Sequence, residues 1–226
     1  MSTRNAIDSD NRDRQRAKRM GVAPSSSLRR HFLSLARQTV QWAKTPGQTV
    51  SRPCSIGVTS MSRGAGNSTV AYNLAVALTS VARSKVLLVE SNFGRHFITR
   101  RLGHSRQMGL SELITGVTEM SEIVSETPIR DLEVIGCGQV AEQVALELPF
   151  DELPSVMNRN FIDYGYTIFD LPTASHLSAC YSIAPALDCI ILTVEANHID
   201  HKLISRFRNS MQSFGVSIVG MVINKQ

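Results

Sequence analysis

Short apolar runs alternate with segments of helical periodicity from about residue 54 to the end of the chain. Six apolar runs predict strands at 54–59, 85–90, 132–135, 166–170, 189–194 and 217–223. Between them, the spacing of apolar positions predicts helices at 68–81, 109–113, 120–124, 150–164, 174–184 and 201–214. Such alternation is typical of α/β proteins, so we expect a three-layer sandwich with a mainly parallel sheet and a ligand site at the carboxyl ends of its strands.

The first 53 residues have a different pattern. Residues 1–27 are polar and charged, which predicts a disordered basic arm. Residues 28–43 place Leu28, Phe32 and Leu35 at helical spacing among basic residues, which predicts an amphipathic helix, and a linker follows. We therefore divide the chain into an arm (1–27), a helix with its linker (28–53) and an α/β domain (54–226).

Charge follows the same division. Up to residue 53 there are eleven Lys and Arg residues against three Asp, whereas the remainder has thirteen basic and sixteen acidic residues. The formal net charge of +5 therefore originates in the N-terminal part. Such a run is typical of a solvated arm; contact with an anionic membrane surface is the alternative, and nucleic acid is a disfavoured partner.

The chain has four cysteines, Cys54, Cys137, Cys180 and Cys189. They form no CxxC pair and have no His-rich spacing around them, which predicts buried thiols in a reducing compartment and gives no support for zinc. No stretch approaches the roughly 18 consecutive apolar residues of a membrane span, and the N-terminus is charged where a signal peptide is apolar. We expect a cytoplasmic protein, with a peripheral position at the inner face of the plasma membrane as an option.

A glycine-rich turn separates the first predicted strand from the helix that follows it. Residues 60–69 read Ser-Met-Ser-Arg-Gly-Ala-Gly-Asn-Ser-Thr. Backbone N–H groups converge in such a turn and the helix N-terminus favours negative charge, so the turn is a candidate phosphate site. The P-loop pattern GxxxxGK(S/T) requires a Lys where this chain has Asn67. A tight turn without a ligand is the alternative, and present-day nucleotide binding is left open.

Five blocks in the correct order resemble the bacterial tyrosine kinases of capsule and exopolysaccharide synthesis (CpsD/CapB type), which are MinD/ParA-like P-loop ATPases. They are residues 55–103, 109–116, 132–138, the strand that ends in Asp170, and 220–225. The resemblance spans about residue 28 to the C-terminus. It implies a P-loop NTPase fold, ATP or ADP with Mg²⁺ as cofactors, and a membrane-embedded polysaccharide chain-length regulator as a partner.

The resemblance also implies roles for residues of the turn. Ser68 stands at the Mg²⁺-ligating hydroxyl and Thr69 at a second phosphate-contacting hydroxyl. Asn67 replaces the Lys that bridges the β- and γ-phosphates, and its amide supplies no charge. Arg63 is a candidate to supply a guanidinium instead, and Asn224 stands where relatives contact the purine. The implied cofactor-binding set is Arg63, Gly64, Ala65, Gly66, Asn67, Ser68, Thr69 and Asn224.

Two carboxylates are the candidate catalytic residues. Asp170 ends a strand that resembles the Walker B strand, so it would hold Mg²⁺ through water, with Ser68 as the second metal ligand. Glu90 stands at the first position of the family's Asp-x-Asp motif and Asn92 at the second, where an amide cannot act as a base at neutral pH. Each carboxylate has a structural alternative, Asp170 as a helix cap and Glu90 as a structural residue.

Three departures from the family pattern favour a pseudoenzyme. Asn67 replaces Lys, Asn92 replaces Asp, and no cluster of tyrosines follows the last predicted strand. We therefore expect a kinase-like regulatory or scaffold subunit of exopolysaccharide or capsule biosynthesis and export, with weak or lost nucleotide binding. An active ATP-dependent protein tyrosine kinase or ATPase is the first alternative, and a ParA-like positioning ATPase is the second. Residues 28–43 lack the family's Glu-x-x-Arg-x-x-Arg contact pattern, so assembly into a homo-oligomer is left open.

Overall fold

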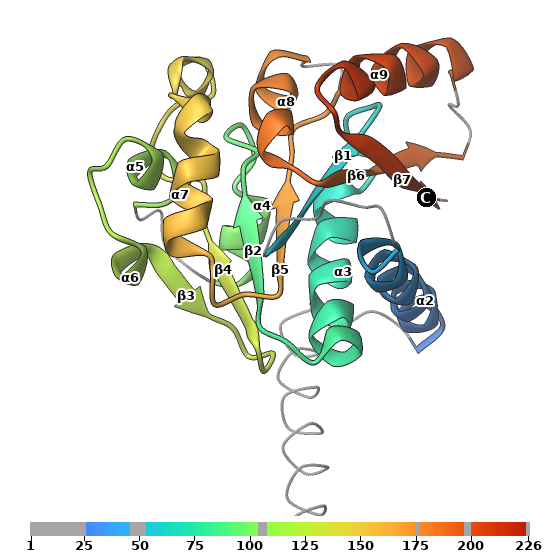
Figure 1. Ribbon diagram of the computed structural model, residues 1–226, viewed down its shortest axis with the longest axis horizontal. Coiled ribbons are helices and arrows are strands. Elements are labelled where there is room, and N and C mark those ends of the chain that lie inside the picture. Colours follow the sequence, from blue (N-terminus) through green and yellow to red (C-terminus); the bar gives the residue numbers. More distant parts are fainter. Residues whose placement is uncertain (1–25, 46–52, 104–107, 175–176, 197–199, 225–226) are drawn as a thin grey trace, which may run out of the picture.

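The computed structural model describes residues 26–45, 53–103, 108–174, 177–196 and 200–224 (Figure 1). Most of the predicted arm and the linker at 46–52 lie outside the described residues. The described strands form one seven-stranded sheet in the order β3-β4-β2-β5-β1-β6-β7. Their bounds are β1 (Cys54–Ser60), β2 (Val86–Glu90), β3 (Val124–Glu126), β4 (Leu132–Ile135), β5 (Tyr166–Asp170), β6 (Cys189–Glu195) and β7 (Ser217–Asn224).

All neighbouring strands pair in parallel except β3, which is antiparallel to β4. The predicted α/β fold with a mainly parallel sheet is therefore confirmed. The described α-helices are α2 (Ser26–Ala43), α3 (Asn67–Ala82), α4 (Phe97–Arg101), α5 (Leu110–Ile114), α6 (Met120–Ile123), α7 (Leu153–Asn160), α8 (Leu177–Ile183) and α9 (His201–Ser213). Short 3-10 helices occur at Val144–Glu147, Phe150–Glu152 and Ala184–Ala186.

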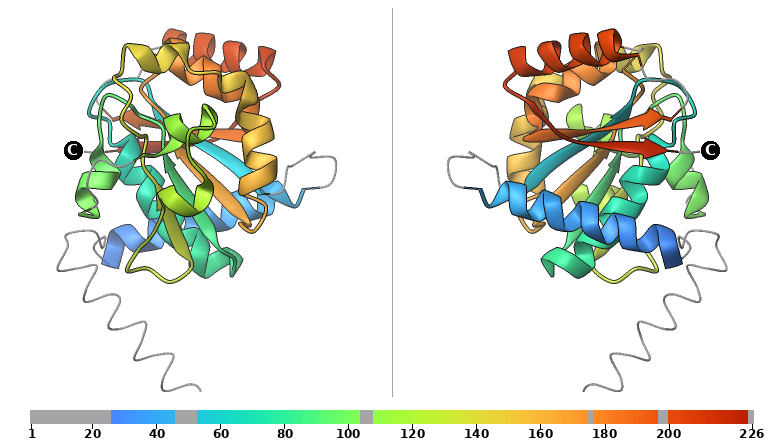
Figure 2. Two further views of the ribbon diagram at one scale, coloured as in Figure 1. Left: turned by 90° about the vertical axis from the view of Figure 1, so that its left-hand side faces the viewer. Right: turned by 90° about the vertical axis from the view of Figure 1, so that its right-hand side faces the viewer.

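Helices cover both faces of the sheet, which gives three layers (Figures 1 and 2). One face packs against α2, α3 and α4, and the opposite face packs against α5, α7, α8 and α9. Strands β1, β2 and β5 are buried along their whole length because both of their faces are covered. On β5, Ile168 faces the α3 side and Phe169 the α7 side, and neither is exposed. The apolar runs in the sequence thus form the centre of the sheet.

Helix α2 packs against α3, with Phe32 and Ala36 buried in the same core as the α3 side of the sheet. It is the amphipathic helix that the sequence predicts, and it begins at Ser26 instead of Leu28. No helix in the described part of the chain is long and apolar enough to cross a membrane. All four cysteines are free of disulfides and buried, as predicted.

Three segments differ from the sequence prediction. The predicted helix at 120–124 ends at Ile123, and Val124 begins β3, an edge strand of three residues that is too short to show its period in the sequence. Helix α4 was not predicted, because its five residues depend on a contact with β2 rather than on a local pattern. The predicted helix at 150–164 is also shorter, since a 3-10 turn precedes α7 and Phe161 ends it.

Candidate functional site

The carboxyl ends of β1, β5 and β2 lie side by side at one edge of the sheet. Val58 of β1 is in register with Asp170 of β5, and Asp170 is in register with Glu90 of β2. The glycine-rich turn leaves β1 at this same edge and leads directly into α3. The fold therefore brings the two candidate carboxylates and the candidate phosphate loop together, as the parallel sheet predicts.

The backbone of the turn contains two glycines in the left-handed region, as a tight glycine-rich turn requires. Gly64 and Gly66 have φ values of +88° and +89°, a backbone conformation that residues other than glycine rarely adopt. Gly66 is the N-cap of α3, and its carbonyl accepts a hydrogen bond of 2.9 Å from the Val70 N–H. Ser68 is buried in the first turn of α3, whereas Thr69 is exposed. The α3 N-terminus therefore opens at the strand ends, where its dipole favours an anion.

Asn67 points its side-chain amide across to the end of β5. Its Nδ2 donates to the Leu171 carbonyl at 2.8 Å and to Asp170 Oδ1 at 3.2 Å. Only 7% of the residue is exposed. The position that holds the phosphate-binding Lys in the P-loop pattern thus holds a buried amide whose donors are used within the protein.

Asp170 is fully buried beneath this amide. Desolvation by burial raises the pKa of its carboxyl from 3.8 to about 8; the Ser68 hydroxyl acts in the opposite direction, and the Glu90 carboxylate adds to the rise. Its Oδ2 has no hydrogen-bond partner of good geometry among the described residues, although Ser68 lies close enough to affect the pKa. Burial therefore favours the protonated form of this carboxyl near neutral pH.

Glu90 is fully buried, and its carboxylate is directed at the start of α4. Oε1 accepts a hydrogen bond of 2.7 Å from the Ile98 N–H, and Oε2 accepts from both the N–H and the hydroxyl of Thr99. Burial raises the pKa of Glu90, and these hydrogen bonds oppose the rise. The side chain thus holds the first turn of α4 in place, and it does not line the pocket described next.

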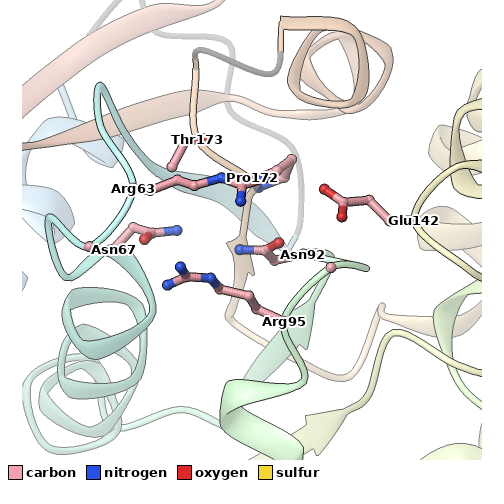
Figure 3. Close-up of a pocket in the computed structure, with 9 residues that line it drawn as sticks. Arg63, Asn67, Asn92, Arg95, Glu142, Pro172 and Thr173 are labelled. Atoms are coloured by element: carbon pink, nitrogen blue, oxygen red, sulfur yellow. The ribbon is translucent and has the colours of Figure 1, made fainter.

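A pocket lies in front of the loop, and Figure 3 shows the side chains that extend into it. The guanidinium groups of Arg63 and Arg95 both extend toward its centre, in which the Asn67 amide also lies. Glu142 lies at the opposite wall, against the backbone of Gly94. The lining residues are Arg63, Gly64, Asn67, Asn92, Gly94, Arg95, Glu142, Pro172 and Thr173. The pocket is therefore polar and contains two cationic groups.

The predicted site residues fall into three groups. Arg63, Gly64 and Asn67 line the pocket. Asp170 lies behind Asn67, and Glu90 is turned toward α4. The remaining five form the loop, its helix and the support behind it: Ala65, Gly66, Ser68, Thr69 and Asn224.

Asn224 lies behind the loop rather than in the pocket. Its Nδ2 donates to the Ala65 carbonyl at 3.0 Å, and a Cβ on Gly66 would meet the same Nδ2 at 2.6 Å. Sequence reasoning missed Arg95, Glu142 and Thr173 as pocket residues. Arg95 follows Asn92 closely in the sequence, which was a usable signal, whereas Glu142 comes from a separate loop with no motif.

These features define a P-loop α/β protein of the MinD-like fold. No family model matches the chain. The chain is 25% identical over 174 residues to the tyrosine-protein kinase CpsD of Streptococcus agalactiae, which covers 75% of this chain and 74% of the relative. It is 22% identical over 174 residues to the putative tyrosine-protein kinase CapB of Staphylococcus aureus, covering 76% and 75%.

Solved structures agree with this class. The kinase domain of the Escherichia coli tyrosine kinase ETK superposes with a TM-score of 0.74 at 20% identity, covering 85% of this chain and 74% of that domain. The septum site-determining protein MinD of Pyrococcus horikoshii OT3, solved with Mg-ADP, gives a TM-score of 0.62 at 20% identity, covering 76% and 70%. The predicted resemblance to CpsD/CapB-type tyrosine kinases and to MinD-like P-loop ATPases is thereby confirmed.

Proposed function

We propose that this chain is a tyrosine-kinase-like subunit of a capsule or exopolysaccharide export system that regulates or scaffolds the system without transferring phosphate. The names of its relatives support the kinase-like origin. The intact loop backbone supports descent from a nucleotide-binding protein. The state of the side chains around that loop supports the loss of phosphoryl transfer.

Asn67 carries this proposal. A Lys at this position would place a positive charge between the phosphates, where charge develops as a phosphoryl group leaves. The Asn67 amide is neutral, and its donor groups are bound to Leu171 and Asp170. A charge-assisted hydrogen bond is roughly twice as strong as a neutral one, so the loop loses its main contact with the β- and γ-phosphates.

The two candidate Mg²⁺ ligands have suitable oxygen atoms, but burial favours the protonated form of Asp170. Ser68 and Asp170 offer the oxygen donors that Mg²⁺ prefers, and the unpaired Oδ2 of Asp170 is a suitable position for one. At pH 7 the proton on this carboxyl is favoured, because the pKa of Asp170 is about 8. Binding Mg²⁺ would first require loss of this proton. We infer that nucleotide and Mg²⁺ bind weakly or not at all near neutral pH.

The partner in this proposal is a membrane-embedded polysaccharide chain-length regulator, to which the chain docks from the cytoplasmic side. The test uses a cell that carries the gene for this chain and produces the polymer. Deletion is expected to lower polymer yield or change chain length, and plasmid-borne Ser68→Ala and Asp170→Asn variants are expected to restore output as fully as the unmodified chain. Failure of both variants, at normal protein levels, would show that the phosphate site is needed and would refute the proposal.

One observation favours a second candidate, an active kinase or ATPase with rearranged chemistry. Arg63 and Arg95 place two guanidinium groups in the pocket, and Arg binds phosphate bidentately. If the chain is such an enzyme, the purified chain should show Mg²⁺-dependent ATP turnover, and Arg95→Ala and Asp170→Ala should each abolish it. Absence of turnover in the unmodified chain rejects it.

A further inference from the structure

Three ligand-type side chains from separate segments meet beside the pocket. Glu90 ends β2, His96 immediately precedes α4, and Cys137 follows β4. Strands β2 and β4 are parallel neighbours, with Val89 in register with Ile135, so their carboxyl ends lie together. One ligand atom from each of the three side chains lies within 4.8 Å of the other two. The Cys137 Sγ is 3.0 Å from His96 Nδ1.

We propose that Glu90, His96 and Cys137 bind a thiophilic divalent cation, with Zn²⁺ as the expected occupant. A thiolate, an imidazole and a carboxylate are the three donor types that zinc uses, and three protein ligands leave a fourth position for water or a further ligand. Magnesium and calcium select all-oxygen sites, so they do not fit this donor set. The proposal does not rest on the function proposed above.

The distance between Cys137 and His96 requires only a small adjustment. In a tetrahedral zinc site with bonds of about 2.3 Å to sulfur and 2.0–2.1 Å to nitrogen, the two donor atoms are about 3.5 Å apart. The Cys137 and His96 atoms would therefore separate by about 0.5 Å to admit the ion. His96 is half-buried and immediately precedes α4, a helix of five residues, so its ring has room for this movement.

The surroundings of Glu90 suit a metal ligand. The Ile98 and Thr99 N–H groups and the Thr99 hydroxyl fix the orientation of its carboxylate, as neighbouring donors do for metal-bound carboxylates. Oε1 accepts only the Ile98 hydrogen bond, so one of its two lone pairs remains for an ion. Glu90 is fully buried and forms no ion pair with a described Lys or Arg, although the charge of Arg100 opposes the rise of its pKa. A cation at this position would compensate the buried charge.

Binding would link this site to the pocket. The ion would connect the segment between β2 and α4 with the end of β4. Asn92, Gly94 and Arg95 of that segment line the pocket, and Arg95 directly precedes His96. Zinc would therefore fix the position of a cationic side chain in the pocket.

The experiment uses the full chain, reduced, treated with chelator and then titrated with Zn²⁺ against a chromophoric chelator and separately with Co²⁺. One equivalent of zinc is expected to bind, and Co²⁺ is expected to give the visible bands of tetrahedral coordination together with a thiolate-to-cobalt charge-transfer band. Cys137→Ser and His96→Ala are expected to lower zinc affinity at least tenfold. Cys180→Ala, which removes another buried thiol, is the matched control and is expected to bind like the unmodified chain.

Circular dichroism and thermal melting verify that each variant is folded. His96→Ala keeps the test valid if the buried Cys137 position does not tolerate Ser, because His96 is half-buried. The proposal is overturned if the unmodified chain binds less than one equivalent of zinc at micromolar concentrations. It is equally overturned if the thiolate band persists in folded Cys137→Ser, since the ion would then lie at other residues.

Discussion

The ends of β1 and β2 flank the same central strand, yet they differ in what they retain. At the end of β1 the backbone of a phosphate loop is intact, with left-handed glycines and an open helix N-terminus, while the side chain at position 67 is bound internally. At the end of β2 a carboxylate is retained, but it serves as an acceptor for the start of α4. The β1 end keeps the loop backbone but has no positive charge at position 67. The β2 end keeps the Glu90 carboxylate, which is directed at α4 instead of the pocket.

This difference shows that packing preserves the loop backbone, whereas burial determines the state of the polar side chains. The loop backbone is fixed by the packing of α3 on the sheet, which is independent of any ligand. The polar side chains at these strand ends are buried. Without a ligand, each is stable only if it has a hydrogen-bond partner within the protein or is uncharged. Asn67 and Glu90 have found partners, and Asp170 between them has a pKa raised to about 8. Four sets of substitutions test this view, in order of decreasing effect on stability.

The largest effect is expected for Asp170→Asn. Between about pH 4 and pH 8 the folded protein keeps a proton on Asp170 that the unfolded chain has released, so the free energy of unfolding falls as the pH rises through this range and levels off above it. The variant lacks this dependence and should be more stable at pH 8.5 by on the order of 5 kcal/mol, since each pKa unit corresponds to about 1.4 kcal/mol. Urea unfolding at pH 5 and pH 8.5 measures both proteins. Identical pH dependence in the two would contradict the buried-acid description.

At the β2 end, Glu90→Ala leaves the Ile98 and Thr99 donors without their acceptor and opens a cavity. The free energy of unfolding should fall by about 2–4 kcal/mol, and hydrogen exchange of the α4 amides should accelerate. Glu90→Gln is the matched control, because it fills the same volume and its amide oxygen can replace one of the two acceptor oxygens, so it should cost less than Glu90→Ala, about 1–2 kcal/mol. Equal losses in the two variants would show that the carboxylate does not cap α4.

At the β1 end, the two left-handed glycines provide a matched pair. Gly64→Ala meets open space and should cost only the backbone strain, about 1 kcal/mol. Gly66→Ala has the same strain and also places its Cβ 2.6 Å from Asn224 Nδ2, so it should be the more destabilising of the two. Thermal unfolding of both variants gives the difference. A larger loss for Gly64→Ala would mean that Asn224 does not support the loop.

The smallest effect is expected for Asn224→Ala, which removes one partly buried hydrogen bond to the Ala65 carbonyl. It should cost about 0.5–1.5 kcal/mol. Combined with Gly66→Ala it should cost less than the sum of the two single changes, because the contact that Gly66→Ala strains is already gone. A double-mutant cycle from urea unfolding measures this coupling, and strict additivity would count against a contact between the loop and the end of β7.

The sequence predicts the sheet better than the site. Strands β4 and β5 have the predicted bounds, because each is a short, mostly apolar run with clear ends. The position of the loop also follows from the sequence, since its glycines and its place between strand and helix are local features.

The orientation of the site's side chains could not be predicted in this way. The partner of Asn67 lies 103 residues away, and the cluster of Glu90, His96 and Cys137 joins segments that no spacing rule connects. The acceptor role of Glu90 depends on α4, a helix of five residues with no periodic pattern. Such contacts arise only when the strands are placed side by side.

The measurement that most directly tests the loss of the phosphate site is calorimetric titration with ADP and with a non-hydrolysable ATP analogue, each with and without Mg²⁺, on the unmodified chain and on Asn67→Lys. A Lys at this position restores the charge of the loop and lowers the pKa of the adjacent Asp170. We predict no binding by the unmodified chain up to about 1 mM nucleotide, and measurable Mg²⁺-dependent binding by Asn67→Lys. Micromolar binding by the unmodified chain that Asn67→Lys leaves unchanged would contradict the loss of the phosphate site.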